Sequence, residues 1–410
     1  MKRYDLSHLC EKHSGLKRLW SIFPEARLVG GCVRDSLLGQ VPHDIDMAVP
    51  YPPERVIEKL KAAKQRFFPT GLEHGTVSVL IKGEIYELTS LRQDLVTDGR
   101  HAQVAWTADW QKDAERRDFT INAMSMDKTG KLYDYFGGEA DLRLGKVRFV
   151  GVPALRIQED YLRILRYFRF SARFEQEAPS KKILKVISEA LEGFATLAKE
   201  RIRDEFSKIL LGPHLIRTLY AMEEAGILKR LFQSYEIEAL NTGLALDLPE
   251  DFILRLYVLC PEIEILKKTF ALSNKEKKRL SFFAHFGNVF ELTSDMPTLL
   301  KYLDQYPLSD LMAYSYIAEI KDAESVISKD KTCKNDWEIL RQRLQETVLP
   351  EFPVAGRDLL ERNVEAGPQI GALLKEMRLY WLAQEAKVTK QEILKYFGLQ
   401  GWKIAKEREP

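Results

Sequence analysis

The spacing of the apolar residues changes near residue 154, and this change constrains the fold more than any other feature of the sequence. Before it, short β-branched or aromatic runs are bounded by Gly, Pro, Asp or Glu, which is typical of strands. After it, apolar residues recur at i, i+3, i+4 and i+7, which is the spacing of amphipathic helices. The sequence therefore predicts an α+β protein, with a small mixed α/β head followed by an all-helical neck, body and tail. The expected strands are 27–31, 44–49, 76–81 and 85–91, and the expected helices include 54–65, 158–174, 181–192, 198–211, 214–225 and 252–268.

The length of 410 residues predicts two to four folded units, since a domain typically has about 150 residues. We place their bounds at 1–150 for a catalytic head, 151–213 for a helical neck, 214–335 for a helical body and 336–410 for a helical tail. Two local signals are specific. Lys82-Gly83-Glu84 separates two expected strands and predicts a hairpin turn, and Ser273 with Glu276 forms a capping box that opens a helix.

Composition excludes several classes of protein. The 62 Lys and Arg residues balance 60 Asp and Glu residues, so any basic surface must be local. Four cysteines (Cys10, Cys32, Cys260 and Cys333) lie far apart, which excludes a thiolate zinc site and a disulfide framework. The N-terminus has no uninterrupted apolar segment, and the most apolar later stretch, 252–260, is about half as long as a membrane span. We therefore expect a cytoplasmic protein, without export or membrane insertion.

A pair of glycines, Gly30 and Gly31, follows an expected strand and precedes a helical run. Glycines at this place let the backbone turn sharply and present N–H groups to an anion. Arg34, one turn into the helix, would add a bidentate donor to a phosphate. A plain tight turn with no ligand is the alternative interpretation of the glycine pair.

Two carboxylates, Asp44 and Asp46, flank Ile45 in the second expected strand. Residues i and i+2 of a strand share a face, so the two carboxylates would lie side by side with Ile45 in the core. Such a pair is repulsive unless a hard cation binds it, and Mg²⁺ takes one or two carboxylates plus substrate phosphates. The pair predicts metal-dependent phosphoryl or nucleotidyl transfer, with a solvated strand end as the alternative. Glu87, in a neighbouring strand, is either a third carboxylate of the site or, as we expect, a surface residue at a strand edge.

The run LVGGCVRDSLLGQVPHDIDMAV, residues 28–49, resembles the head signature of class II tRNA nucleotidyltransferases and the related bacterial poly(A) polymerases. These enzymes belong to the nucleotidyltransferase superfamily of DNA polymerase β. The resemblance continues through 115–123, 158–170 and 199–205, and so covers roughly half of the chain. It implies a polymerase β-like head and the template-independent addition of C, C and A to the 3′ end of tRNA, with release of pyrophosphate.

The resemblance also implies cofactors, partners and site residues. It implies Mg²⁺ as cofactor and tRNA, ATP and CTP as partners, with neither a membrane nor DNA among them. It assigns Asp44 and Asp46 to catalysis and to the metals. It assigns to nucleotide contacts Gly31, Arg34, Arg117, Asp160, Arg163, Arg166 and Arg169. A poly(A) polymerase or an enzyme that adds only A is the alternative activity. A catalytically inactive RNA-binding module is the alternative from another class, although such a module would gain nothing from the carboxylate pair.

Asp160, Arg163, Arg166 and Arg169 are spaced three apart, which predicts that they follow one face of a helix. A carboxylate only accepts hydrogen bonds and a guanidinium only donates them. Cytosine and adenine both present an amino donor beside an acceptor nitrogen, whereas guanine and uracil present the reverse order. An Asp160–Arg163 pair would accept C and A and penalise G and U by about 1–3 kcal/mol for each unmatched buried group. The alternative is a solvated basic face.

Three further segments carry weaker signals. Residues 94–105, with Asp98-Gly99-Arg100-His101, resemble the flexible loop that helps this family pass from C to A addition, and we expect His101 to be a loop residue. The basic cluster at 267–279 either contacts phosphate or, as we expect, is a solvated helix face. Residues 352–374 resemble the tail of the family, with Asn363 where Gly is expected and Ala366 where Pro is common. No His-Asp pair occurs after residue 150, so we do not predict an appended phosphohydrolase domain.

Overall fold

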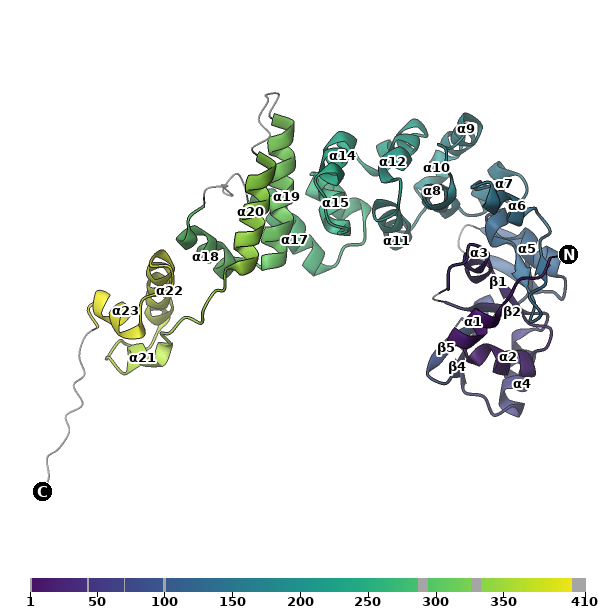
Figure 1. The fold of residues 1–410 in the computed structure, drawn as a ribbon, viewed down its shortest axis with the longest axis horizontal. Helices are drawn as coiled ribbons and strands as arrows, with labels where there is room; N and C mark the ends of the chain where they lie inside the picture. The colour runs from purple at the N-terminus through teal and green to yellow at the C-terminus, as the bar shows by residue number, and fades with distance from the viewer. Residues whose placement is uncertain are drawn as a thin grey trace, which may run out of the picture. The chain divides into compact units, whose positions relative to one another are not determined.

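The structure is a computed structural model, and it describes residues 2–42, 44–69, 71–98, 101–286, 294–325 and 333–399 (Figure 1). The chain forms two compact units, one of residues 1–234 with 268–271 and one of residues 235–267 with 272–410. The expected head and neck fall within the first unit. The bounds at 150, 213 and 335 stay a prediction, and we keep the names head for 1–150 and neck for 151–213.

A seven-stranded mixed sheet forms the head, in the order β3-β4-β5-β2-β1-β8-β9. Its strands are β1 (Arg27–Val29), β2 (Asp46–Val49), β3 (Phe67–Phe68), β4 (Thr76–Ile81), β5 (Glu84–Ser90), β8 (Ser125–Met126) and β9 (Leu132–Tyr133). Strands β2 and β5 are parallel, and the other neighbours are antiparallel. This order places β2 and β5, which carry Asp46 and Glu87, side by side in the middle of the sheet.

The hairpin predicted at Lys82 and Gly83 is confirmed, because β4 and β5 pair antiparallel around it. Both residues have positive φ values, 52° and 89°, which a two-residue hairpin turn favours. The segment 94–105, expected as a loop, instead contributes to an antiparallel ribbon of β6 (Arg92–Asp98) and β7 (His101–Trp106). Gly99, Arg100 and the side chain of His101 lie outside the described residues.

Helices surround this sheet and continue into the neck (Figure 1). Those of the head are α1 (Ser7–Lys12), α2 (Gly15–Ile22), α3 (Gly31–Leu37), α4 (Pro53–Ala62), α5 (Trp110–Glu115) and α6 (Gly138–Arg143), with 3₁₀ turns η1 (Leu72–His74) and η2 (Thr120–Asn122). Those that follow are α7 (Pro153–Glu159), α8 (Leu162–Phe174), α9 (Lys181–Glu189), α10 (Leu191–Phe194), α11 (Lys199–Leu210), α12 (Leu215–Glu224) and α13 (Ile227–Leu231). Helix α8 packs on α11 and α12, and α3 packs on β1 and η2.

The single helix expected over 158–174 is wrong. Helix α7 ends at Glu159, Asp160 is extended with φ −157° and ψ 105°, and α8 begins at Leu162. The carboxylate of Asp160 accepts the backbone N–H of Leu162 at 3.1 Å, as an Asp near the first turn of a helix does. Asp160 therefore lies at a break between two helices and does not share a helix face with Arg163, Arg166 and Arg169.

An aromatic cluster joins the head to α8. The ring of Phe119 lies 4.8 Å from that of Phe149 and 5.4 Å from that of Phe170, and Tyr167 stacks on Phe149 at 5.7 Å. All four side chains are buried. Because aromatic side chains bury large apolar areas, this cluster fixes the position and rotation of α8 against the segment that contains Phe119.

The second unit is helical. It contains α14 (Ile237–Ala245), α15 (Phe252–Leu259), most of α16 (Ile263–Thr269), α17 (Asn274–His285), α18 (Met296–Gln305), α19 (Leu308–Ser325), α20 (Cys333–Glu346), α21 (Gly356–Leu360), α22 (Pro368–Ala383) and α23 (Lys390–Tyr396). Helix α19 packs between α14 and α20, and α18 packs on α22 (Figure 1). The expected helix 252–268 is broken, because Pro261 cannot continue α15. The predicted capping box of Ser273 and Glu276 is confirmed at the start of α17.

The tail segment explains one departure from the family pattern. Asn363 has a φ of 62°, a left-handed conformation that glycine adopts freely and asparagine tolerates better than most residues. Asparagine can therefore replace the expected glycine without a change of backbone. Nothing in the structure explains Ala366. In the described ranges, no helix is both long enough and apolar enough to cross a bilayer.

Candidate active site

Three carboxylates surround the start of β2. Asp46 is the first residue of β2 and lies opposite Glu87 of β5 in the parallel register. Ile45 is buried, as predicted, and exposed Asp44 lies in a bend just before the strand. Glu87 is exposed, as expected of a surface residue, but it lies on an inner strand and not at an edge of the sheet.

The three carboxylates repel one another. Burial raises the pKa of Asp46, the negative charges of Glu87 and Asp44 raise it further, and Arg117 partly offsets the shift. The ionised form of Asp46 is therefore short of positive charge in this fold. A bound cation would supply that charge.

The donor set suits a hard divalent cation. Within the residues that the structure describes, no group of three or more His, Cys, Asp or Glu side chains is arranged to hold a metal ion by itself. Mg²⁺, however, is usually held by one or two carboxylates together with waters and substrate phosphates. Asp44 and Asp46, with the raised pKa of Asp46, fit such a partly formed site.

The glycine turn lies against two arginines. Gly30 has a φ of 67°, and a Cβ atom added there would lie 3.1 Å from Nη1 of Arg117. A Cβ atom added at Gly31 would lie 3.5 Å from Nη2 of Arg34. The absence of side chains thus leaves both guanidinium groups close to the backbone of the turn, where a triphosphate could contact them.

Arg117 is held by a buried acid. Asp113 accepts from Nη2 of Arg117 at 3.1 Å and from Nη2 of Arg116 at 2.7 Å. Burial alone would raise the pKa of Asp113, but the two arginines and the backbone N–H of Arg92 hold it below its ordinary value. The position of Arg117 beside Asp46 is therefore fixed by a carboxylate that remains ionised.

A chain of polar contacts joins Arg34 in α3 to the arginines of α8. Nη1 of Arg34 donates to Oδ1 of Asn122 at 2.6 Å, and Nδ2 of Asn122 donates to Asp118 at 3.1 Å. Nε of Arg166 donates to the other oxygen of Asp118 at 2.7 Å. Burial would raise the pKa of Asp118, but Arg166 and the hydrogen bonds from Asn122 and the backbone hold it below its ordinary value.

Arg166 and Arg169 meet a second buried acid, Glu205 of α11. Nη1 of Arg169 lies 2.9 Å and Nη1 of Arg166 lies 3.7 Å from Oε1 of Glu205. Phe170 lies among the same arginines, with the guanidinium carbons of Arg34, Arg166 and Arg169 at 5.3, 5.3 and 4.3 Å from its ring centre. Three of the predicted nucleotide-binding arginines are thus gathered around one aromatic ring.

Asp160 and Arg163 are held by different partners. Asp160 receives Nη1 and Nη2 of Arg201 at 3.2 and 2.8 Å. Arg163 donates to Glu159 at 2.5 Å and to the backbone carbonyls of Arg156 and Arg116 at 2.8 and 3.2 Å. The side chains of Asp160 and Arg163, predicted to read the base together, thus have separate anchors, and the backbone N–H of Arg163 donates to the carbonyl of Asp160 at 3.0 Å.

Comparison with known proteins agrees with this geometry. Residues 26–148 match the family described as the poly(A) polymerase head domain, and residues 178–238 match the probable RNA and SrmB binding site of polymerase A. The mitochondrial CCA tRNA nucleotidyltransferase 1 of Mus musculus is 34% identical over 93% of this chain and 89% of its own length. Its Homo sapiens counterpart is 35% identical over the same shares.

The chain belongs to the CCA tRNA nucleotidyltransferase family. The CCA-adding enzyme of Staphylococcus epidermidis, 27% identical over 93% of this chain and 95% of its own, is another relative. The resemblance found in the sequence motifs is thereby confirmed, and the chain is an enzyme of the nucleotidyltransferase class.

Solved structures of this family share the fold. The Bacillus stearothermophilus CCA-adding enzyme in complex with CTP has a TM-score of 0.71 and 23% identity, over 93% of this chain and 98% of its own. A tRNA nucleotidyltransferase with a primer tRNA and an incoming ATP analog has a TM-score of 0.54 and 22% identity, over 78% and 93%. These matches confirm the predicted fold class of a mixed head followed by helices.

Sequence reasoning missed four residues that position the site of this nucleotidyltransferase: Asn122, Phe170, Arg201 and Glu205. Arg201 and Glu205 lie in the motif at 199–205, and the motif alone was the available signal. Their partners Asp160 and Arg169 are 41 and 36 residues away, so the helical periodicity of the sequence does not indicate these ion pairs.

The other carboxylate oxygen of Glu205, Oε2, is buried and has no hydrogen-bond partner among the described residues.

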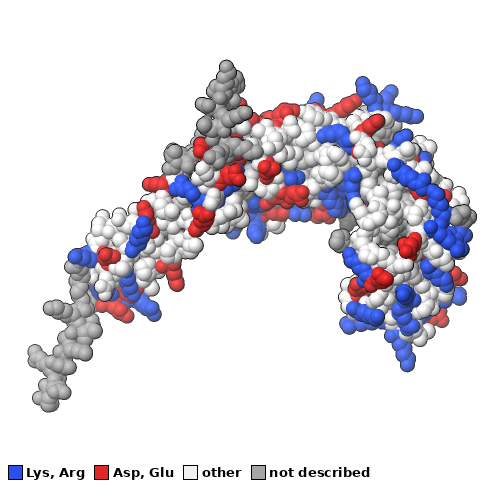
Figure 2. Space-filling model, in the orientation of Figure 1, with Lys and Arg blue, Asp and Glu red and all other residues white. Residues whose placement is uncertain are grey.

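Positive charge gathers in the unit that holds the site. Residues 1–234 and 268–271 carry 39 Lys and Arg against 32 Asp and Glu, whereas the other unit carries 23 against 28. Figure 2 shows lysine and arginine side chains spread over the head and neck elements. The near-zero total charge of the chain is therefore the sum of a basic unit and an acidic unit. The positive charge of the basic unit suits a polyanionic substrate.

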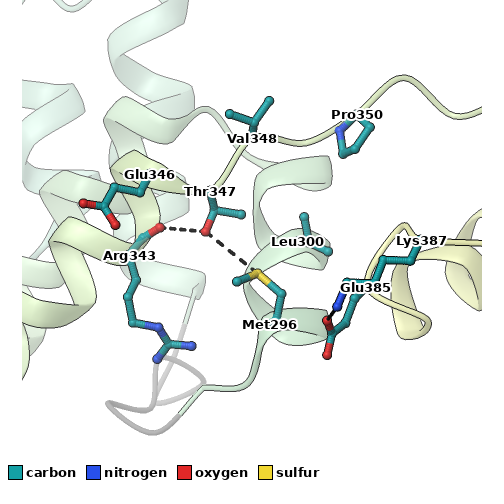
Figure 3. Close-up of a pocket in the computed structure, with 9 residues that line it drawn as sticks. All are labelled: Met296, Leu300, Arg343, Glu346, Thr347, Val348, Pro350, Glu385 and Lys387. Carbon is teal, nitrogen blue, oxygen red and sulfur yellow. Dashed lines mark hydrogen bonds and ion pairs between the residues drawn. The ribbon is translucent and has the colours of Figure 1, made fainter.

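Two further features lie apart from this chemistry. In the basic cluster at 267–279, Arg279 pairs with Asp310 at 2.9 Å and with Asp251, so this residue joins helices. A pocket of about 440 Å³ is bordered by α18, by the end of α20 and by the chain after α22 (Figure 3). Its charged lining residues are Arg343, Glu346, Glu385 and Lys387, whose charges cancel, and none of them belongs to the unit with the carboxylates.

Proposed function

We propose that this chain adds C, C and A to the 3′ end of tRNA from CTP and ATP, without a nucleic acid template and with release of pyrophosphate. The observation that carries the proposal is the position of Asp46, which lies beside Glu87 and Asp44 and within the electrostatic influence of Arg117. Carboxylates and guanidinium groups at one place are what a metal-bound triphosphate requires. The sequence relationship to CCA tRNA nucleotidyltransferases gives the substrate class.

The triphosphate would lie against the glycine turn. Arg34 and Arg117 both approach the backbone of Gly30 and Gly31, and they supply donors for phosphate oxygens. Asp44 and Asp46 would hold Mg²⁺, which when bound activates a hydroxyl and neutralises phosphate charge. In the reaction, the 3′-hydroxyl of tRNA attacks the α-phosphorus, and the bond to pyrophosphate breaks.

Asp160 and Arg163 would read the base of the incoming nucleotide. Asp160 would accept the exocyclic amino group of C or A, and Arg163 would donate to the adjacent ring nitrogen. Both side chains lie at the start of α8, and 23% of the Asp160 side chain and 12% of the Arg163 side chain are exposed. Arg166 and Arg169 would complete the nucleotide contacts, with Phe170 supporting them.

The basic unit would bind tRNA, and we propose neither DNA nor a membrane as a partner. We propose the cytoplasm as the compartment, which the scattered cysteines of the sequence support. The two vertebrate relatives carry the word mitochondrial in their names, so a mitochondrial location is the competing assignment. Fractionation of cells that express the natural chain distinguishes the two compartments.

The test is a single-nucleotide incorporation assay. The protein is incubated with tRNA that lacks its three terminal residues, with each NTP separately and with CTP and ATP together, and the products are sized. The proposal predicts two additions with CTP alone, three with CTP and ATP, and none on a DNA primer of the same 3′ sequence. Long A tails on unrelated RNA would support a poly(A) polymerase. A parallel reaction uses tRNA that already ends in CC, and addition of one A there with no addition to the shortened tRNA would support an A-adding enzyme. No addition to either tRNA would support an RNA-binding module.

A further inference from the structure

The two carboxylates of the proposed metal site are not held in the same way. Asp46 is the first residue of β2 and pairs with Glu87, whose backbone N–H donates to the carbonyl of Ile45 at 3.2 Å. Asp44 precedes these contacts and lies in an exposed bend. The ladder between β2 and β5 therefore fixes the position of Asp46, whereas the position of Asp44 depends on the segment before it.

A histidine between the first two helices contacts that segment. Nε2 of His13 lies 3.2 Å from the carbonyl oxygen of Pro42, which is two residues before Asp44 in the sequence. A carbonyl oxygen only accepts hydrogen bonds, so Nε2 carries the proton in this contact and donates it. Pro42 is buried, and a buried carbonyl is costly to leave without a donor.

His13 is itself held on several sides. Its backbone N–H donates to the carbonyl of Leu9 in α1 at 2.8 Å, and its carbonyl accepts from the N–H of Leu16 in α2 at 3.1 Å. Only 7% of the residue is exposed, and the ring of Tyr86 lies 6.5 Å from its ring at an angle of 84°. Two helices and one aromatic ring thus fix His13, so it can serve as an anchor for Pro42.

Tyr86 connects this anchor to the strand that carries Glu87. Its hydroxyl accepts the backbone N–H of Gly15 at 3.1 Å and donates to Glu84. A Cβ atom added at Gly15 would lie 2.5 Å from the Tyr86 ring, so the glycine allows the ring to reach the start of α2. Strand β5 therefore carries Glu87 and also binds the helices from which His13 extends.

We infer that His13 is a positioning residue for the metal site, which holds the carbonyl of Pro42 and thereby keeps Asp44 where it can bind a cation together with Asp46. The inference rests on the proposed role of Asp44 as a ligand of Mg²⁺. Mg²⁺ requires near-ideal geometry, so a displaced carboxylate binds it less well. Loss of the His13 donor should therefore raise the Mg²⁺ concentration that the enzyme needs, with a smaller effect on the rate at saturating Mg²⁺.

Three variants separate the donor from the bulk of the side chain and from the stability of the helices. His13→Leu keeps a side chain of similar size without a donor, whereas His13→Gln keeps an N–H donor. Trp20→Phe in α2 is the matched control, because it removes a buried donor, Nε1 of Trp20, from the carbonyl of Ala26 at 3.0 Å. Ala26 precedes β1, which carries no carboxylate of the site. A general loosening of the helices would affect His13→Leu and Trp20→Phe alike.

The first measurement is the Mg²⁺ concentration for half-maximal addition of C to tRNA that lacks its terminal residues. The second is the binding of Mn²⁺ in the presence of CTP, followed by electron paramagnetic resonance, since Mn²⁺ takes the same oxygen ligands as Mg²⁺. His13→Leu should raise the Mg²⁺ requirement roughly fivefold, the loss expected for one buried hydrogen bond, and should weaken Mn²⁺ binding by a similar factor. His13→Gln should recover most of the loss, and Trp20→Phe should behave as the wild type.

Hydrogen exchange tests the structural step without a metal. In the protein free of cations and nucleotide, the amides of peptides that cover residues 40–49 should exchange faster in His13→Leu than in the wild type, because the contact with Pro42 is lost. Trp20→Phe should leave the exchange of these peptides unchanged. Equal exchange in His13→Leu and the wild type would overturn the inference.

The outcomes distinguish this inference from the function on which it rests. If Asp44→Ala weakens Mn²⁺ binding and His13→Leu does not, His13 is not a positioning residue and the role of Asp44 stands. If Asp44→Ala keeps the affinity of the wild type for Mn²⁺, the proposed metal ligand fails, and the inference fails with it. The double variant should bind Mn²⁺ as Asp44→Ala alone does, and a further loss would overturn the inference. Should His13→Leu fail to fold, His13→Ala, which also lacks the donor, carries the same comparison.

Discussion

Asp46 and Glu87 lie opposite each other on adjacent parallel strands, and each strand presents a carboxylate at the same level of the sheet. Burial and the charge of Glu87 are the two largest causes that raise the pKa of Asp46. A fold that places like charges together in its centre loses stability, unless a ligand of opposite charge binds there. This relationship supports the proposed site more directly than any single motif does, because a surface carboxylate at a strand end would not have a raised pKa.

Replacing Glu87 by Gln should shift the pH dependence of nucleotide addition. Without the negative charge of Glu87, the pKa of Asp46 falls toward its ordinary value, so more of Asp46 is ionised at low pH. The acidic limb of the rate profile should therefore move to lower pH, with activity at pH 8 retained. Glu58→Gln, on the exposed face of α4, is the charge-matched control and should leave the profile unchanged. Loss of activity at every pH would show instead that Glu87 is itself a metal ligand.

Gly30→Ala should impair nucleotide binding, and Gly39→Ala should not. Both glycines have positive φ values, 67° and 72°, so each alanine should be destabilising by about 1 kcal/mol or more, and Gly30, with ψ at −128°, should lose more than Gly39. The new Cβ atom at Gly30 would lie 3.1 Å from Arg117, whereas nothing lies within 4 Å at Gly39. Urea denaturation and the KM for CTP check the prediction. An equal KM for the two variants would remove Arg117 from the triphosphate site.

Arg166→Ala should destabilise the protein by about 3 kcal/mol, because it leaves the buried carboxylate of Asp118 without its cation. In the wild type the pKa of Asp118 is lowered, so its stabilising contribution is present at neutral pH and is lost as pH falls through that lowered value. In the variant the pKa should rise above the ordinary value, and acidification should relieve the penalty. The difference in unfolding free energy between variant and wild type should therefore shrink from pH 7 to pH 4.

A control for this prediction lies on the same helix. Arg173 is 44% exposed and pairs with Asp35 at 3.3 Å, so Arg173→Ala should cost less than about 1 kcal/mol. A cost for Arg166→Ala as small as that of Arg173→Ala would show that Asp118 is stabilised by Asn122 and the backbone alone.

Asp160→Ala should lower C and A incorporation and weaken the discrimination against U and G, with little change in triphosphate affinity. The acceptor for the amino group is lost, while Arg163 can still donate to a carbonyl of U or G. The binding of the triphosphate depends on Arg34, Arg117 and the metal, none of which contacts Asp160 in the proposed site. Incorporation assays with all four NTPs measure the selectivity, and product inhibition by pyrophosphate measures the triphosphate site.

The sequence predicts features that local interactions determine. The hairpin at Lys82 and Gly83 depends on two residues with positive φ, and the capping box of Ser273 and Glu276 depends on a four-residue contact. The β-branched run at 76–81 likewise predicts β4 at its observed bounds. In each case the residues that specify the structure are neighbours in the chain.

The sequence does not predict features that depend on contacts between residues far apart in the chain. No Gly or Pro marks the break at Asp160, whose backbone is extended and whose carboxylate is bound by Arg201, 41 residues further along the chain. The break after Leu259 did carry a local signal, Pro261, which the apolar periodicity obscured. Among the site residues, Asp46 could be predicted from its motif. Its position opposite Glu87, however, depends on the strand order of the folded sheet, which the sequence does not show.

The carboxylate pair allows the most direct test of the account. Asp44→Ala and Asp46→Ala are each assayed for addition of C, C and A to tRNA that lacks its terminal residues, with binding of the same tRNA measured in parallel. We expect addition to fall roughly a thousandfold or more, because the charge stabilisation of the metal site is lost, while tRNA affinity and the far-UV circular dichroism spectrum stay unchanged. Near-normal turnover in either variant would contradict it.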